Sequence, residues 1–379
     1  MIREIQIKNF KSIDDLTLEL GRVNVLIGAN GCGKTNILEA ICLGGAAVAD
    51  KLDNEYLAPR GIRYATPREM RSGFQLETLN KPVELKFINS NSNIFEPILT
   101  HSNETRQNWT VSLKYTQDDQ IRFTPAKIKL ALQSISNIDH SEIAAERILT
   151  SIVFLRAAVE FFQLSNFLIY SPDHTSIRRL EDEERTLPLG IDGCGLFRLL
   201  QELSLEKIEE VKTHLRMIDW FDDFEMPDNL IPGERRLRIK DQYIAEGLQF
   251  FEQRVANEGF LFLLFYLCLF ISEHTPKFFA IDNLDNGFNP KLCTYTAKTL
   301  CELAKTHDKQ AIITTHNPSV LDGLDLKDDE NRLFVVYRNI EGRTRIRRIL
   351  PKDQPQDEPP LRLSEAFLRG YLGGLPRNF

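Results

Sequence analysis

The sequence has little that would place the chain in a membrane, in an oxidising compartment or around a zinc ion. Its longest apolar run without a charge, Phe260 to Ile271, is shorter than the roughly 20 residues that span a bilayer, so it predicts a buried helix. The six cysteines include no CxxC pair, which favours reduced core thiols over a disulfide framework or a structural zinc site. The first residues lack the apolar h-region of a signal peptide, and we therefore expect a cytoplasmic protein without membrane contact.

Several catalytic patterns are also missing. There is no HExxH metalloprotease motif, no GxSxG nucleophile elbow and no acidic cluster typical of a nuclease. No long heptad pattern predicts coiled-coil arms. The 47 Lys and Arg residues against 54 Asp and Glu give a net charge of −7, which argues against a protein that wraps nucleic acid with its whole surface. With 42% hydrophobic and 27% charged residues, the 379-residue chain is typical of a globular protein.

Strand and helix patterns alternate at the two ends of the chain, with a different middle. Alternation at Ile5 and Ile7, and again from Leu16 to Leu20, predicts two paired strands joined by Phe10 to Asp15. A strand at 23–27 and a helix after GANGCGKT follow. The later pattern predicts, in order, strands at VELKF and WTVSLKY, helices at 144–162 and 203–217, a long helix from about Tyr243, a strand at KFFAID, a helix at 290–305, a strand at QAIITTH, strands at RLFVVYRN and TRIRRIL, and a helix at 363–371. This order is typical of a composite α/β domain that carries an insertion.

One motif has a direct chemical reading. Gly28, Ala29, Asn30, Gly31, Cys32, Gly33, Lys34 and Thr35 match GxxxxGK[ST], with a predicted strand before the loop and a predicted helix after it. Glycines let backbone N–H groups turn towards phosphate oxygens, and the helix N-terminus adds partial positive charge. Lys34 would neutralise the β- and γ-phosphates and the Thr35 hydroxyl would ligate Mg²⁺. The loop therefore predicts ATP and Mg²⁺ as cofactors.

Two further side chains follow buried strands. Four apolar residues run into Asp282, which would supply the carboxylate of the magnesium shell, and the next apolar strand ends at His316. Taken alone, an Asp or His at such a place is often only a turn residue. Their order after the phosphate-binding loop makes them candidates for the same site.

The order of these motifs resembles that of the ABC-type ATPases. The residues within the motifs resemble the SMC/RecF-like branch, the compact bacterial "AAA-family" ATPases. The resemblance rests on IKNFKSIDDLTLEL, VNVLIGANGCGKTNILEAI, IDNLDNGFNPKL, ITTHNPSVLDGL and LSEAFLRGYLGGLP, with a looser match at LPLGIDGCGLFRLL. It implies an α/β fold, an ABC-type P-loop ATPase head with an N-terminal antiparallel β lobe and an inserted helical lid. Residues 1–379 would form one composite head, with its core at 1–50 and 241–350, the insertion at 51–240 and a C-terminal helix at 361–379.

The resemblance also implies roles for single residues. Asp282 would lie in the magnesium shell, and His316 would contact the γ-phosphate. Asn257, Glu258 and Gly259 would form the signature, presented to the γ-phosphate of a partner subunit. Asp285 and Asn286 would lie in a loop that crosses the dimer interface, and Phe10, Lys11 and Ser12 would bring backbone near the adenine. Two ATP molecules would lie between two head-to-tail copies.

The sequence departs from this family pattern at two places. Asn283 occupies the position of the usual Glu that orients the attacking water, and an amide cannot take a proton from it. General base catalysis contributes about 10²–10⁴-fold, so we expect slow hydrolysis. Asp285 could replace the base only if the strand continued that far. The signature, Asn257 to Gly259, replaces a more usual Ser-x-Gly type, and both departures favour an ATP-held clamp or sensor over a fast motor.

Two basic segments are candidate contact surfaces. One comprises Arg343, Arg345, Arg347 and Arg348, and the other comprises Arg235, Arg236, Arg238 and Lys240. They could follow the phosphates of nucleic acid or bind an acidic protein, or they could simply be solvated strand faces.

The resemblance favours the ATPase component of a bacterial anti-phage defence system, acting as sensor or scaffold for a separate effector, a nuclease or toxin. A RecF-like DNA-repair clamp and a catalytically weak ATP-dependent scaffold are the alternatives.

Overall fold

The computed structural model describes most of the chain. The described residues are 1–49, 51–63, 65–101, 109–116, 121–123, 161, 163–179, 188–227, 237–245, 250–351 and 361–375. The predicted helix at 144–162 lies outside them except for Phe161, and Arg235 and Arg236 also lie outside them.

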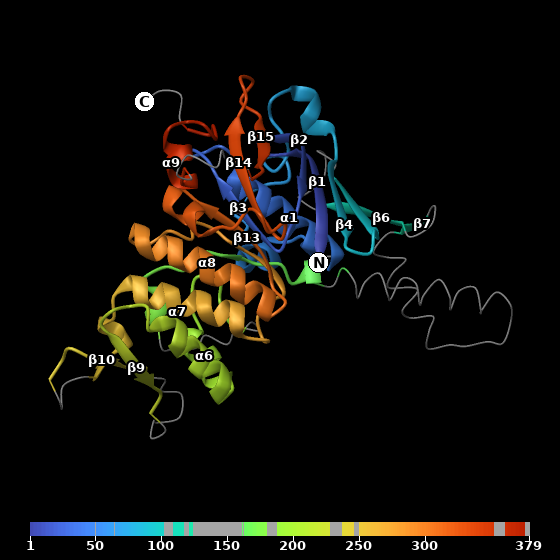
Figure 1. The fold of residues 1–379 in the computed structure, drawn as a ribbon. Helices are drawn as coiled ribbons and strands as arrows, with labels where there is room; N and C mark the ends of the chain where they lie inside the picture. Colours follow the sequence, from blue (N-terminus) through green and yellow to red (C-terminus); the bar gives the residue numbers. More distant parts are fainter. Residues whose placement is uncertain are drawn as a thin grey trace, which may run out of the picture.

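An antiparallel sheet forms one side of the molecule (Figure 1). Its strands lie in the order β2 (Ile13–Glu19), β1 (Ile2–Phe10), β4 (Val83–Asn89), β5 (Ile94–Thr100), β6 (Thr110–Thr116) and β7 (Ile121–Phe123). The predicted N-terminal strand pair is confirmed, because Ile5 pairs with Leu18 and Ile7 with Leu16. These four side chains are buried, as their alternation predicts.

A second sheet forms the centre of the molecule. Its order is β15 (Thr344–Ile349), β14 (Asn331–Arg338), β3 (Val23–Ile27), β13 (Gln310–Thr315), β12 (Phe278–Ile281) and β8 (Ile169–Tyr170). All neighbours run parallel except β14 and β15, which are antiparallel. Every residue of β3, β12 and β13 is buried, as expected for parallel strands covered on both faces. The segments that follow these three strands therefore leave the sheet at one common edge.

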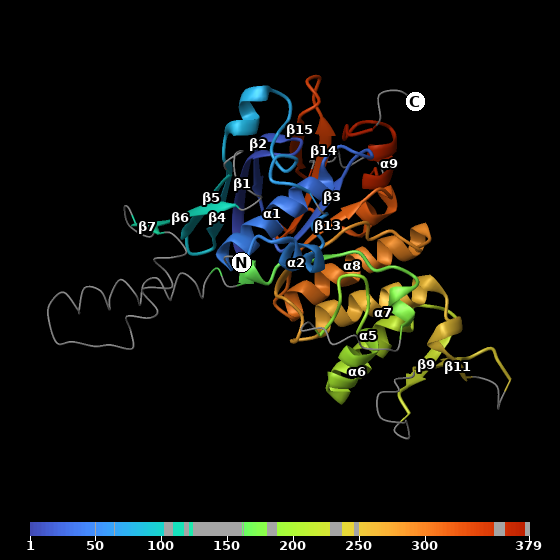
Figure 2. The same ribbon diagram turned by 180° about the vertical axis from the view of Figure 1, so that it is seen from behind.

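Helices cover the two faces of the central sheet (Figures 1 and 2). Helix α1 (Lys34–Val48) shares a hydrophobic core with the antiparallel sheet and with Leu26 of β3. Helices α7 (Glu258–Ile271) and α8 (Pro290–Thr306) share the other core with Val25 of β3. The apolar run Phe260–Ile271 lies buried in α7, as predicted. Within the described residues, no helix is both long and apolar enough to cross a bilayer.

A smaller group of elements packs beside α7. It comprises α5 (Leu196–Glu202), α6 (Leu205–Leu215) and a sheet of β11 (Phe250–Glu252), β10 (Arg238–Asp241) and β9 (Phe221–Glu225). The prediction of a long helix from about Tyr243 is wrong, because β11 and the 3-10 turn η4 (Gln253–Val255) precede α7. Helix α7 begins only after Asn257, whose Oδ1 accepts the N–H of Phe260 at 2.8 Å and so caps the helix.

Short elements complete the fold. They are α2 (Asn54–Leu57), η1 (Ala58–Arg60), η2 (Leu76–Asn80), η3 (Ser176–Arg178), η5 (Pro318–Gly323) and α9 (Leu363–Leu368). The other strands and helices predicted within the described residues are present with shifted ends. The fold is a mixed α/β fold with an antiparallel lobe and a parallel sheet, as expected for a P-loop ATPase head.

A buried carboxylate joins the antiparallel lobe to α1. The side chain of Glu39 on α1 is inaccessible to solvent, and it accepts hydrogen bonds from Arg63 Nε at 2.7 Å and from Lys11 Nζ. Burial alone would raise the pKa of Glu39, but the bonds and charges of Arg63 and Lys11 outweigh burial and lower it. The ionised carboxylate therefore stabilises the fold.

We expect Glu39→Gln to reduce the free energy of unfolding by about 1–3 kcal/mol at pH 7, because the amide leaves two cations without their counter-charge. The pKa of Glu39 is lower in the folded chain, so its stabilisation is complete above the unfolded pKa of about 4 and is lost as pH falls further. The free energies of unfolding of wild type and variant, measured in urea, should therefore approach each other progressively as the pH falls below about 4. The control is Glu202→Gln, which removes a pair with Arg198 at the surface. An equal loss in both variants would contradict the prediction.

Candidate nucleotide-binding site

The phosphate-binding loop connects the carboxyl end of β3 to the N-terminus of α1. Gly31 and Gly33 have φ angles of 71° and 109°, which favour glycine. A Cβ atom on Gly33 would lie 2.1 Å from Thr344 Oγ1 of β15, so no larger residue fits there. The strand, loop and helix predicted from residues 23–48 are therefore all present in the expected order.

Lys34 lies folded back over this loop. Its Nζ donates to Gly28 O at 2.8 Å and Ala29 O at 3.2 Å, and lies 3.5 Å from His316 Nδ1. The residue is only 5% exposed, and burial lowers the pKa of its ammonium against the opposing effects of Asp282 and other groups. Two neutral carbonyls are weak compensation for a buried cation, so the position suits an anionic ligand.

Asp282 follows β12 and meets two hydroxyl groups. Thr35 Oγ1 lies 3.1 Å from its Oδ2, and Thr314 Oγ1 donates to its Oδ1 at 2.5 Å. A carboxylate and a hydroxyl are hard oxygen ligands of the kind Mg²⁺ prefers, and they fit a metal that also binds phosphate and water. Within the described residues there is no cluster of three or more His, Cys, Asp or Glu that would hold a metal without such additional ligands.

His316 follows β13 at the same edge, and Asp285 fixes its backbone. Asp285 Oδ1 accepts from Thr315 Oγ1 at 2.6 Å and from His316 N at 3.1 Å. Burial, together with the charge of Lys34, lowers the pKa of His316, so the imidazole is neutral at pH 7. The sequence-predicted residues Lys34, Thr35, Asp282, Asp285 and His316 thus lie together.

Asn283 begins the turn after β12. Its φ angle of 59° lies in the left-handed region, where Asn is better tolerated than Glu. Its N–H donates to Thr314 Oγ1 at 2.9 Å. The strand ends at Ile281, so it does not continue to Asp285, which leaves that carboxylate in the turn and bonded to the His316 segment.

Asn257, Glu258 and Gly259 lie elsewhere, at the start of α7. Together with Gly287 and Lys291 they line a cavity of about 550 Å³, and no residue of the phosphate-binding loop is among its described lining residues. A Cβ atom on Gly259 would lie 3.1 Å from Gly287 O. One chain therefore presents these two predicted parts of the site in separate places.

Three residues beside the loop were missed by sequence reasoning. Asn36 Nδ2 donates to Ser12 Oγ at 2.6 Å, and Ser12 Oγ lies 2.7 Å from Thr344 Oγ1, which donates to Cys32 O at 2.8 Å. Arg63 also reaches Asn36 Oδ1 at 3.1 Å. The family resemblance predicted a role for Ser12, and the motif predicted the loop. No feature of the sequence indicated Arg63 or Thr344. Asn36, directly after the loop, could have been considered.

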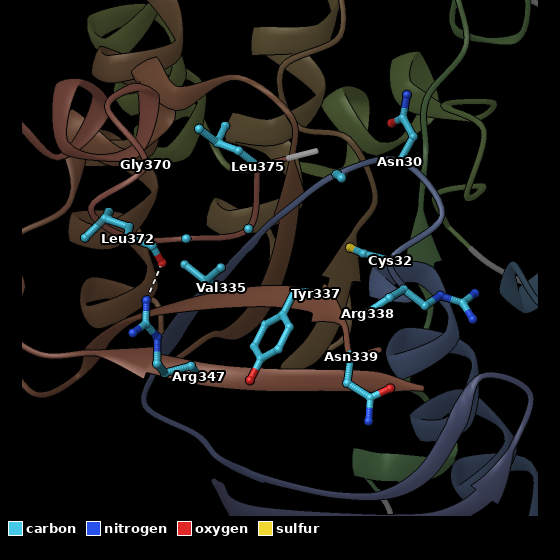
Figure 3. Close-up of a pocket in the computed structure, with 13 residues that line it drawn as sticks. Asn30, Cys32, Val335, Tyr337, Arg338, Asn339, Arg347, Gly370, Leu372 and Leu375 are labelled. Carbon is cyan, nitrogen blue, oxygen red and sulfur yellow. Dashed lines mark hydrogen bonds between the residues drawn. The ribbon is translucent and has the colours of Figure 1, made fainter. Parts of the chain in front are cut away.

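A second cavity of about 620 Å³ lies beside the phosphate-binding loop (Figure 3). It is lined by Ala29, Asn30, Cys32, the end of β14, Arg347, Gly370 and residues 372–375. Figure 3 shows the Arg347 guanidinium directed at the carbonyl of Leu372, to which it donates a hydrogen bond.

All six cysteines are free and buried, as predicted, and burial raises the pKa of the Cys32 thiol.

The predicted basic segments are occupied by contacts within the chain. In and just before β15, Arg343 pairs with Asp14 at 2.6 Å, Arg348 pairs with Asp329 and Arg345 donates to Asp15 O at 3.2 Å. In β10, Arg238 pairs with Glu225 at 2.6 Å and Lys240 pairs with Asp222 at 2.6 Å. These contacts would have to break or be shared before the cations could follow a phosphate backbone.

Comparisons with known proteins agree on the kind of molecule. The family model described as "AAA domain, putative AbiEii toxin, Type IV TA system" matches residues 23–322. The "Uncharacterized protein MJECL10" of Methanocaldococcus jannaschii is 31% identical over 125 residues, which are 31% of this chain and 55% of that protein. The OLD nuclease of Thermus scotoductus is 46% identical over 43 residues, 11% of this chain and 8% of that protein. RecF of Bacillus cytotoxicus is 44% identical over 55 residues, 14% of this chain and 15% of that protein.

The matched stretches cover little more than half of these relatives at most. Among solved structures, an SMC head bound to the C-terminal winged-helix domain of ScpA has a TM-score of 0.54 at 14% identity, over 92% of this chain and 98% of that one. The SMC head domain of Thermotoga maritima has a TM-score of 0.50 at 14% identity, with the same coverage. At this identity the likeness shows the fold. The chain therefore belongs to the AAA-domain family whose model it matches, and it is an ABC-type ATPase of the SMC/RecF-like kind.

Proposed function

We propose that the chain binds Mg²⁺–ATP at the phosphate-binding loop and dimerises around it. The observation that carries this proposal is that Lys34, Thr35, Asp282 and His316 meet at one edge of the parallel sheet. Backbone N–H groups from Gly28 to Thr35 would hold the phosphates and Lys34 would neutralise them. Thr35 and Asp282 would hold Mg²⁺, which lowers the charge repulsion at the phosphates, and His316 would contact the γ-phosphate.

The separation of the two predicted parts of the site supports the proposed dimer. The start of α7 lines a different cavity from the phosphate-binding loop, so Asn257, Glu258 and Gly259 would reach the γ-phosphate only from a second copy. The N-terminus of a 14-residue buried helix carries partial positive charge, which favours a phosphate. Asp285 and Asn286, in the turn next to His316, would lie at the interface of two head-to-tail copies.

Asn257→Asp tests the dimer. Asp is as good an N-cap as Asn, so α7 should remain intact, but the new charge would face the partner's γ-phosphate and repel it. We expect an unchanged dissociation constant for ATP in the monomer and loss of the ATP-dependent dimer in light scattering after size exclusion.

Ser204→Asp is the matched control, because Ser204 caps α6 in the same way. Lys34→Ala should lose both ATP binding and the dimer. A dimer that forms with Asn257→Asp as readily as with the wild type would contradict the head-to-tail arrangement. ATP binding that survives Lys34→Ala would overturn the nucleotide site itself.

We propose further that hydrolysis is slow, because the position of the expected general base is Asn283. Its amide can hydrogen-bond a water but cannot accept its proton. The left-handed backbone there favours Asn over Glu, so the turn itself accommodates the residue that lacks a carboxylate. Asp285 already accepts two hydrogen bonds from the His316 segment, which argues against its replacing the base.

Asn283→Glu should raise the rate of ATP hydrolysis by about 10²-fold, because it restores a carboxylate where a general base would act. Asn283→Gln is the control, since it carries the same backbone strain of about 1–2 kcal/mol without a carboxylate. Phosphate release under saturating ATP measures both. A wild type that turns over many ATP molecules per second, with no change in Asn283→Ala, would sink the proposal.

We propose that this ATP-held dimer is a component of an anti-phage defence system and licenses a separate effector. The family description names a toxin of a toxin–antitoxin system, and one relative is an OLD nuclease, which supports this role. The RecF relative supports the clamp alternative, but Arg343 and Arg348 are already paired with acids of the same chain.

Purification together with the products of neighbouring genes should yield a bound nuclease or toxin that is lost with Lys34→Ala. The copurified chains can be identified by mass spectrometry. Binding of duplex DNA that requires ATP, weakens with salt and disappears on charge reversal of Arg345 and Arg347 would instead support the clamp.

A further inference from the structure

The C-terminal segment lies against the phosphate-binding loop. The N–H of Ala29 donates to Gly374 O at 3.2 Å. The start of the loop is therefore held by a backbone hydrogen bond to a residue 345 positions further along the chain. Arg347 of β15 holds the carbonyl of Leu372 in the same segment (Figure 3). Ala29 also provides one of the two carbonyls that hold Lys34 Nζ, at 3.2 Å. Gly28 O, which accepts from Lys34 Nζ at 2.8 Å, belongs to the same peptide unit as Ala29 N–H. The C-terminal segment and the Lys34 ammonium therefore bind opposite sides of one trans peptide unit.

The other end of this segment contacts the His316 side of the site. Ser364 at the start of α9 donates from its N to Asp322 Oδ1 at 2.9 Å and from its Oγ to Asp322 Oδ2 at 2.6 Å. Asp322 belongs to η5, which begins two residues after His316. Phe367 of α9 is 5% exposed and belongs to the core that also contains Leu321 of η5.

Gly374 can make its contact only because it lacks a side chain. Its φ angle is 81°, and a Cβ atom there would lie 2.4 Å from Val335 Cγ1. Gly342, in the turn between β14 and β15, has a nearly identical φ angle of 78°, but its Cβ atom would meet nothing closer than Phe74 Cε1 at 3.4 Å. The two glycines thus carry the same backbone strain on substitution, while only Gly374 is pressed against β14 next to the loop.

We propose that residues 363–375 form a brace that positions the phosphate-binding loop relative to the His316 segment and so sets the affinity for nucleotide. The brace is anchored at Asp322 by Ser364 and at Ala29 by Gly374, on the two sides of the site. Ala29 transmits its position to Lys34 through the carbonyl that the ammonium uses. This inference rests on the proposed nucleotide site, since the brace acts on residues assigned to phosphate binding.

Gly374→Ala should weaken ATP binding about 3- to 10-fold, the equivalent of one lost hydrogen bond, because the added methyl group pushes Gly374 O away from Ala29 N. Gly342→Ala, at a position outside residues 363–375, should leave the dissociation constant unchanged, although both variants melt at a lower temperature without nucleotide. Titration calorimetry with Mg²⁺–ATP on the full chain and thermal unfolding measure the two quantities. Equal affinities in the two variants would overturn the brace.

Ser364→Ala provides a second test of the brace if Gly374→Ala fails to fold. It removes the hydroxyl bond to Asp322 without adding volume, and we expect weaker ATP binding. Where both variants fold, the double variant should bind no more weakly than the weaker single variant, because both interrupt one element. A lower melting temperature with unchanged affinity would mean that Ser364 only supports the fold. Wild-type binding that is lost in Lys34→Ala but unaffected by either brace substitution would refute the brace and leave the nucleotide site standing.

Discussion

A buried ammonium without a full counter-charge is the constraint around which the site is arranged. Lys34 Nζ has two backbone carbonyls and the ring nitrogen of His316 within 3.5 Å, none of which carries a formal negative charge. Placing a cation in a low-dielectric position costs free energy unless an anion approaches it. The loop, the carboxyl edge of the parallel sheet and the neutral His316 therefore form a polar cradle that favours an anionic ligand, although Asp282 and Asp285 already act on the ammonium from a distance.

The parts of this cradle that arise from local sequence could be predicted. A β-branched strand, a glycine-rich loop and a largely apolar helix follow one another within residues 23–48, and each is specified by its own residues. The sequence could predict that Asp282 and His316 lie at the same edge, because both follow apolar strands and parallel strands end at one edge of a sheet. Asn257 caps α7, and this is also a local signal, but the prediction of a helix from about Tyr243 did not use it.

Contacts between distant residues could not be predicted in this way. Nothing near Glu39 indicates that Arg63 and Lys11 will neutralise it, and nothing near Thr344 indicates that it will hold Cys32 O. The arginines of β15 were read as a free basic face, whereas their partners come from the β1–β2 hairpin and other distant segments. The helix predicted from Tyr243 failed because the pairing of β11 with β10 overrides the local pattern.

The position of β3 also dictates the order in which the molecule can be built. Its two neighbours in the sheet are β13 and β14, so Val23 can pair with Ala311 and Asn331 only after those residues have been synthesised. At a synthesis rate of 5–20 residues per second, this strand emerges from the ribosome roughly 15–60 seconds before its partners. The β1–β2 hairpin can fold at once, but β3, which is apolar except for Asn24, remains unpaired beside it. Assembly of the central sheet is thus a late event, and until then β3 exposes unpaired backbone groups to which other strands can bind.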